Sequence, residues 1–201
     1  SVKVLYHYGH CGMASDGTFE AGMGRTWDNT LRADSTRMSF GDQRLRYLLW
    51  HGCHSVQMHF GHNPWRTWAA CNKGARMIFG FDGLTYDIAG LGAGFFREWN
   101  TGKSLSQSWQ DAALATLRDH RPSSTACGAT AEEAQDRLFN ERFFFGDAVS
   151  DDWYWWRFGG PKPIEVKTDI PLPQAPKFLE LVRRRGDERT AKRLAERFDV
   201  R

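Results

Sequence analysis

A chain of 201 residues with 41% hydrophobic and 25% charged residues is long enough for one ordinary globular core, so we expect one main domain. The aromatic content of 14% argues against a disordered chain, and no run approaches the roughly 20 apolar residues that a membrane-spanning helix needs. The net charge of +3 arises in the C-terminal segment, where basic residues crowd between Arg183 and Arg197, so the near-neutral body does not favour nucleic-acid binding.

The first third of the chain contains two apolar runs. Val2–Tyr8 is rich in β-branched and aromatic residues and is followed by Gly9, which predicts a strand. About thirty residues rich in glycine, aspartate, serine and threonine come next, and we expect them to form a long surface loop. Leu45–Trp50 predicts a second strand, which leads into His51-Gly52-Cys53.

Helices alternate with a strand in the middle of the chain. Asn63 and Pro64 supply a cap residue and a proline at the first helical position, so a short helix is expected to start there. Ala75–Phe81 predicts a third strand. Two further helices are expected over Leu91–Trp99 and from the capping box Ser104–Gln107 onward.

The last third of the chain contains a helix, two late strands and an extension. The helix begins at Thr130, and the strands are expected over Arg142–Phe145 and Trp153–Phe158. We therefore divide the chain into a body (1–160), a proline-rich linker (161–176) and a basic helical tail (177–201). Strands that alternate with helices predict an α/β body with a mainly parallel sheet.

Reactive or polar residues follow each of the three predicted strands. His10 follows the first, Cys53 the second and Asp82 the third. Parallel strands place their carboxyl ends at one edge of a sheet, so these side chains are expected to lie together. An imidazole near a thiol can remove its proton, and the backbone N–H groups of Gly12 and Gly52 could stabilise an oxyanion.

These blocks resemble the His and Cys blocks of caspase-like cysteine peptidases, a group that includes caspases, gingipains, separases and bacterial CHAT domains. The similarity covers about residues 2–118, and the chain resembles a bacterial branch of the group. Its motifs are Tyr8–His10, Leu48–Cys53, Lys73–Gly80, Phe95-Phe96 and Thr101–Trp109.

The resemblance implies a caspase–hemoglobinase three-layer fold in which Cys53 is the nucleophile and His10 the base. It further implies cleavage of a protein or peptide substrate, with Asp82 or Asp87 selecting a basic residue before the cut bond, and it implies no cofactor. Two features depart from the group. Cys11 stands where a glycine normally follows the histidine, and the first half of the usual sheet is missing, so an upstream segment or a partner chain is expected to complete it.

Three other hypotheses remain open. A catalytically inactive scaffold could keep the fold and bind protein partners through its aromatic surface and basic tail. A zinc site could draw its four ligands from His10, Cys11, His51 and Cys53. Ser1 could also be a terminal nucleophile released by self-cleavage.

Overall fold

The computed structural model describes residues 2–23, 32–42, 44–86, 89–116, 120–143 and 146–160. Several predictions fall on residues outside these ranges. They are the terminal nucleophile at Ser1, the substrate-binding role of Asp87, the linker (161–176) and the basic tail (177–201).

A five-stranded sheet forms the centre of the body, in the order β1-β5-β6-β7-β8. Its strands are β1 (Val4–Tyr8), β5 (Tyr47–His51), β6 (Met77–Phe81), β7 (Pro122–Gly128) and β8 (Trp153–Phe158). The neighbours β1, β5 and β6 are parallel, whereas β7 is antiparallel to both β6 and β8. Four of the five strands therefore point the same way, which confirms the predicted α/β class with a mainly parallel sheet.

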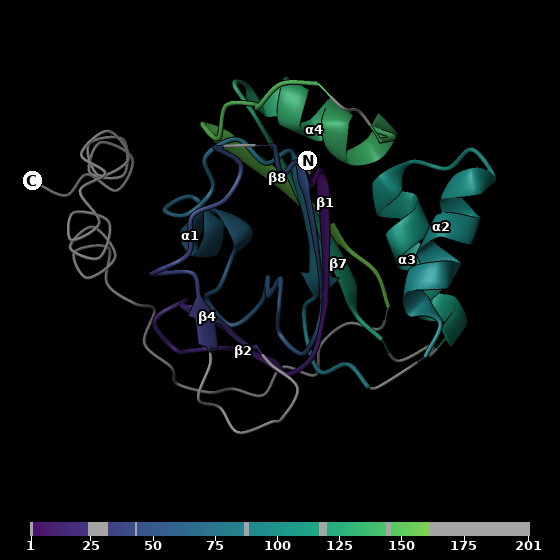
Figure 1. Cartoon of the computed structure of the whole chain (residues 1–201), viewed down its shortest axis with the longest axis horizontal. Coiled ribbons are helices and arrows are strands. Elements are labelled where there is room, and N and C mark those ends of the chain that lie inside the picture. Colours follow the sequence, from purple (N-terminus) through teal and green to yellow (C-terminus); the bar gives the residue numbers. More distant parts are fainter. Residues whose placement is uncertain are drawn as a thin grey trace, which may run out of the picture.

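The remaining elements cover both faces of this sheet (Figure 1). One face carries the helix α1 (Pro64–Trp68) and a small antiparallel sheet made of β2 (Cys11–Met13), β3 (Phe19–Gly22) and β4 (Arg32–Asp34). The opposite face carries α2 (Leu91–Asn100) and α3 (Leu105–Thr116), while α4 (Ala131–Asn140) packs against β7 and β8. None of the helices in the described ranges has the length and apolarity needed to cross a membrane.

Side chains that alternate along each strand supply two separate cores. From β5, Leu48 and Trp50 pack on the face of α1, where Trp68 is fully buried. Tyr47 and Leu49 pack on the other face with aromatic side chains of α2 and α3. The sheet is thus apolar on both sides, which explains why β5 reads as a continuous apolar run in the sequence.

Two of the predicted helix starts are confirmed by their side-chain caps. The Asn63 side chain accepts a hydrogen bond from the Arg66 N–H (2.9 Å), and Pro64 is the first helical residue of α1. The Thr130 hydroxyl accepts from the Glu133 N–H (3.1 Å) at the start of α4. Both are the side-chain caps that the sequence indicated.

The prediction of a long surface loop after the first strand is wrong for the described residues of that segment. Residues there form β2, β3 and β4, and Phe19 and Ala21 of β3 are fully buried against α1 and β5. The high glycine, aspartate and serine content belongs to the turns between these short strands, as in the turn in which the Asp16 carboxylate accepts from the Thr18 N–H (2.9 Å).

Two further differences concern the late strands. β7 was not predicted, since its sequence Pro-Ser-Ser-Thr-Ala-Cys-Gly is small and polar, yet it is buried along its whole length. Its hydroxyls find partners inside the fold, such as Ser123 Oγ, which donates to the Val56 carbonyl (2.7 Å). A strand over Arg142–Phe145 is wrong for Arg142 and Phe143, which are irregular, and the Phe143 ring packs against Trp99 instead.

Candidate functional site

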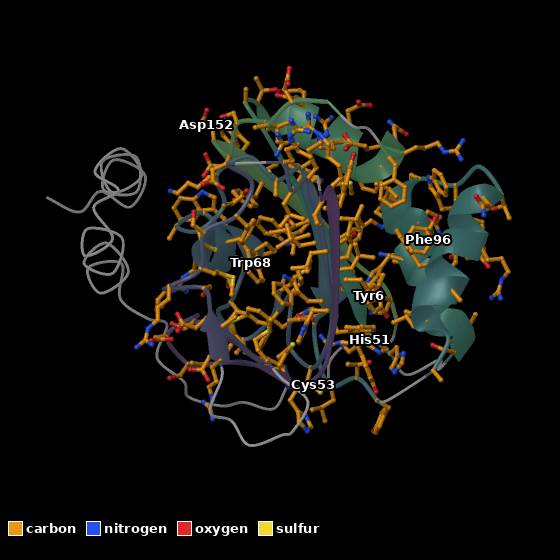
Figure 2. All side chains as sticks on the ribbon, in the orientation of Figure 1. Tyr6, His51, Cys53, Trp68, Phe96 and Asp152 are labelled. Atoms are coloured by element: carbon orange, nitrogen blue, oxygen red, sulfur yellow. The ribbon has the colours of Figure 1, made fainter. Side chains whose placement is uncertain are left out.

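β1 and β5 are parallel neighbours, and His10 and Cys53 each come two residues after the end of one of these strands. Tyr8 is paired with His51, and the Gly9 N–H donates to the His51 carbonyl (3.2 Å). The pairing ends there, and His10 belongs to the next ladder, where its carbonyl accepts from the Gly22 N–H (2.8 Å). The rings of Tyr8 and His51, the last pair of the two strands, lie 4.7 Å apart. Figure 2 shows Cys53 just beyond His51, at the carboxyl edge of the sheet.

The Cys53 thiol is half-buried and is bracketed by the backbone of Thr85. Its sulfur donates to the Thr85 carbonyl (3.3 Å) and accepts from the Thr85 N–H (3.4 Å). An N–H donor stabilises a thiolate, whereas a carbonyl acceptor stabilises the neutral thiol. Thr85 therefore holds the sulfur in a position where both protonation states have a backbone partner.

Gly52 and Gly12, the glycines predicted to stabilise an oxyanion, use their amides within the fold. The Gly52 N–H donates to the Trp50 carbonyl (3.0 Å). Gly12 is paired with Glu20 between two flanking ladder bonds, so its N–H belongs to the β2–β3 ladder. By contrast, no backbone carbonyl among the described residues accepts from the Cys53 N–H.

Gly52 also has no space for a side chain. A Cβ there would lie 2.3 Å from the Cys11 sulfur and 2.6 Å from the Gly9 oxygen. The segment after β1 therefore packs directly on the backbone before Cys53. Burial raises the pKa of the Cys11 thiol to about 12, so this neighbour stays protonated near neutral pH.

Asp82 follows β6 as predicted, but its side chain is fully buried and faces groups of its own chain. The carboxylate accepts from the Met58 N–H (2.5 Å) and pairs with His59 and Arg121. These contacts tie together the loop after β5, the end of β6 and the start of β7. A substrate-binding role for Asp82 stays a prediction, and the structure gives its carboxylate a structural partner in Arg121.

The histidines of the loop after Cys53 gather near Asp82 without forming a metal site. Burial lowers the pKa of His54 and of His62, which favours their neutral forms. Within the described ranges, no group of three or more His, Cys, Asp or Glu residues could hold a metal ion. The ligand set expected for zinc is therefore not assembled there.

Two contacts at this edge involve residues that the sequence did not single out. The Tyr6 hydroxyl bonds to His51 Nδ1 (2.9 Å), and burial raises the pKa of Tyr6 to about 12. His120 Nε2 lies 3.3 Å from the Thr85 hydroxyl and 3.4 Å from the Tyr86 N–H. Tyr6 could have been found, because it shares a strand face with Tyr8. His120 had no signal, since it precedes the unpredicted β7.

A family model described as "domain of unknown function (DUF6345)" matches residues 1–159. The chain belongs to the DUF6345 family. Searches of curated proteins and of solved structures each returned no match. The DUF6345 match ends next to the predicted end of the body at residue 160 and covers every residue of the site described above.

Proposed function

We propose that this DUF6345 domain is a cysteine hydrolase of caspase–hemoglobinase type that cuts peptide bonds with Cys53 and His10. The observation that supports the proposal is the parallel pairing of β1 and β5, whose last pair, Tyr8 and His51, lies two residues before His10 and Cys53. Two adjacent parallel strands are a rigid support for a two-residue catalytic site, because their separation is fixed by the backbone hydrogen bonds between them.

The reaction follows from the roles of these two side chains. His10 accepts the thiol proton as the Cys53 sulfur attacks the carbonyl carbon, and it then donates that proton to the leaving amine. A water molecule, deprotonated by His10, attacks the resulting thioester and releases the acid and the free thiol. The Cys53 N–H is the proposed donor to the oxyanion, since Gly12 and Gly52 use their amides elsewhere.

Substrate preference is a separate part of the proposal. The sequence favoured a basic residue before the cut bond, selected by Asp82 or Asp87. Because Arg121 pairs with the Asp82 carboxylate, this acid offers little net charge to a substrate side chain. A basic preference therefore depends on Asp87.

The test combines thiol labelling with peptide cleavage. An excess of a thiol-reactive probe, with labelled peptides identified by mass spectrometry, is expected to modify Cys53 first in the wild-type domain. Replacing His10 by Ala should slow the labelling of Cys53 at neutral pH, whereas His7→Gln on the same strand should not. Cleavage of a mixed peptide library should disappear in Cys53→Ala and persist in Cys11→Ser.

The inactive scaffold is the second candidate, and the aromatic side chains of β8 favour it. Trp153, Trp155, Trp156 and Phe158 are all about 40% exposed along the last strand of the sheet. Exposed aromatics of this density are typical of binding surfaces. Labelling of Cys53 that is no faster than labelling of Cys11, together with no cleavage by the wild-type domain, would favour the scaffold over the hydrolase.

A further inference from the structure

His120 lies fully buried beneath the edge of the sheet that carries Cys53, directly before the start of β7. Two aromatic rings enclose its imidazole. Phe81 of β6 meets it edge to face at 5.3 Å, and Tyr86 stacks on it at 6.2 Å with an interplanar angle of 15°. The ring is therefore held in one orientation by packing.

The contacts of this ring converge on Nε2. Nε2 accepts from the Tyr86 N–H (3.4 Å), and a backbone N–H can only donate. Nε2 must therefore carry a lone pair, and the neutral ring has its hydrogen on Nδ1. The Thr85 hydroxyl, 3.3 Å from the same nitrogen, is then a second donor to it. Both distances are long, as expected when one lone pair serves two donors.

Thr85 connects His120 to the sulfur. Its N–H donates to the Cys53 sulfur (3.4 Å) and its carbonyl accepts from it (3.3 Å). In the part of the chain that the structure describes, the hydrogen bonds of Thr85 and Tyr86 go to two residues, Cys53 and His120. Leu84 and Tyr86, on either side of Thr85, are more than 60% exposed, so apart from the stacking of Tyr86 on His120, packing contributes little to the position of this segment.

We propose that His120 is a positioning residue that fixes the Thr85 backbone against the Cys53 sulfur. The segment containing Thr85 and Tyr86 is hydrogen-bonded to Cys53 and to His120. Without the imidazole acceptor only the bonds to Cys53 remain, and the Thr85 N–H no longer faces the sulfur in a fixed geometry. The thiolate then loses a donor, because a hydrogen bond to the charged form is what favours that form. The significance for catalysis rests on the proposed function, but the effect on the thiol is independent of any substrate.

The experiment measures the rate at which iodoacetamide alkylates Cys53 from pH 5 to pH 10, by mass spectrometry of the intact variants and their peptides. His120→Leu removes the acceptor, and His120→Gln retains a carbonyl oxygen that can accept from the Tyr86 N–H. In His120→Leu we expect alkylation at pH 7 to be about fivefold slower, on the order of one weakened hydrogen bond, with the profile moved to higher pH. His120→Gln should restore most of the wild-type profile.

His62→Leu is the matched control, since it removes another buried histidine that makes no contact with Thr85. It should leave the Cys53 profile unchanged. A wild-type profile in folded His120→Leu, or equal shifts in the Leu and Gln variants, would overturn the inference.

A second pair of variants keeps the test valid if His120→Leu does not fold. Thr85→Val removes the hydroxyl donor to His120, whereas Thr85→Ser retains it. The Val variant should move the Cys53 profile in the same direction as His120→Leu, and the Ser variant should not. Identical profiles for Val and Ser would contradict the proposed link.

The outcome for His10 separates this inference from the proposed function. If His120→Leu moves the Cys53 profile but His10→Ala changes neither labelling nor cleavage, the hydrolase proposal fails and the positioning role stands. If His10→Ala slows both while His120→Leu moves nothing, the hydrolase stands and His120 has no role in positioning.

Discussion

Replacing Gly52 by Ala tests the close approach on which the site depends. The added methyl carbon would lie 2.3 Å from the Cys11 sulfur, 2.8 Å from the Cys11 Cβ and 2.6 Å from the Gly9 oxygen, whereas ordinary contacts lie at 3.4–4 Å. The segment after β1 must therefore retreat from β5 by roughly 1 Å, and a buried position with backbone on one side does not allow this without strain.

The expected cost is about 2–3 kcal/mol of unfolding free energy, toward the upper end of the range for overpacked sites. Cys11→Gly removes two of the three short contacts and leaves the Gly9 oxygen. The double variant Cys11→Gly/Gly52→Ala should therefore recover roughly 1 kcal/mol relative to the sum of the single variants.

Urea unfolding followed by tryptophan fluorescence measures these differences, provided that the slope of free energy against urea stays constant. Gly12→Ala is the matched control, because a Cβ there meets nothing within 4 Å. It should change stability by less than about 0.5 kcal/mol. A Gly52→Ala variant as stable as Gly12→Ala would show that the segment after β1 is not packed on Gly52 as described.

Three further predictions concern stability. Burial lowers the pKa of His62, so the unfolded chain binds the extra proton more readily than the folded chain does. The contribution of the neutral ring to stability is complete above the unfolded pKa of about 6.5 and is lost as pH falls through the folded pKa. His62→Gln should therefore lessen the fall in urea midpoint between pH 7 and pH 5. Arg121→Met leaves the buried Asp82 carboxylate without its guanidinium partner and should lower the free energy of unfolding in urea by about 3 kcal/mol. Arg32→Ala is the control, because it breaks an exposed ion pair and should lower the free energy of unfolding by about 0.5 kcal/mol or less. Thr130→Ala removes the cap of α4 and should cost about 1 kcal/mol by the same measurement, and a variant as stable as wild type would contradict that role.

The sequence predicted those elements whose residues carry a strong local signal. The central strands β5 and β6 are continuous apolar runs, because both faces of the sheet are covered. Helix starts were readable from Asn63-Pro64 and Thr130, where the cap is a contact between residues three apart.

The sequence did not predict the elements whose conformation depends on residues far away in the chain. β7 has no apolar run, because its small side chains fit between α4 and the rest of the fold, and its neighbours decide its conformation. The short strands β2–β4 were hidden by the polar turns between them. No local pattern could show that Asp82 pairs with Arg121, since 39 residues separate them.

The same limit applies to the candidate site. His10 and Cys53 are candidates because each follows a recognisable strand, and those two strands are parallel neighbours in the structure. Their surroundings, Thr85 and His120, belong to segments that come together only in the folded chain. Sequence patterns therefore reveal the candidate reactive groups before they reveal what holds them.

The buried carboxylate of Asp82 has a consequence for how this domain tolerates change. The carboxylate joins the loop after β5 to the end of β6 and the start of β7, so it anchors the buried side of the sheet edge that carries Cys53. Leu84 and Tyr86 lie outside that anchor and contribute little to it. Substitutions at these exposed positions can therefore change the chemistry at this edge of the sheet while the buried contacts of Asp82 stay in place. The residues that can vary are thus different from those that keep the domain folded.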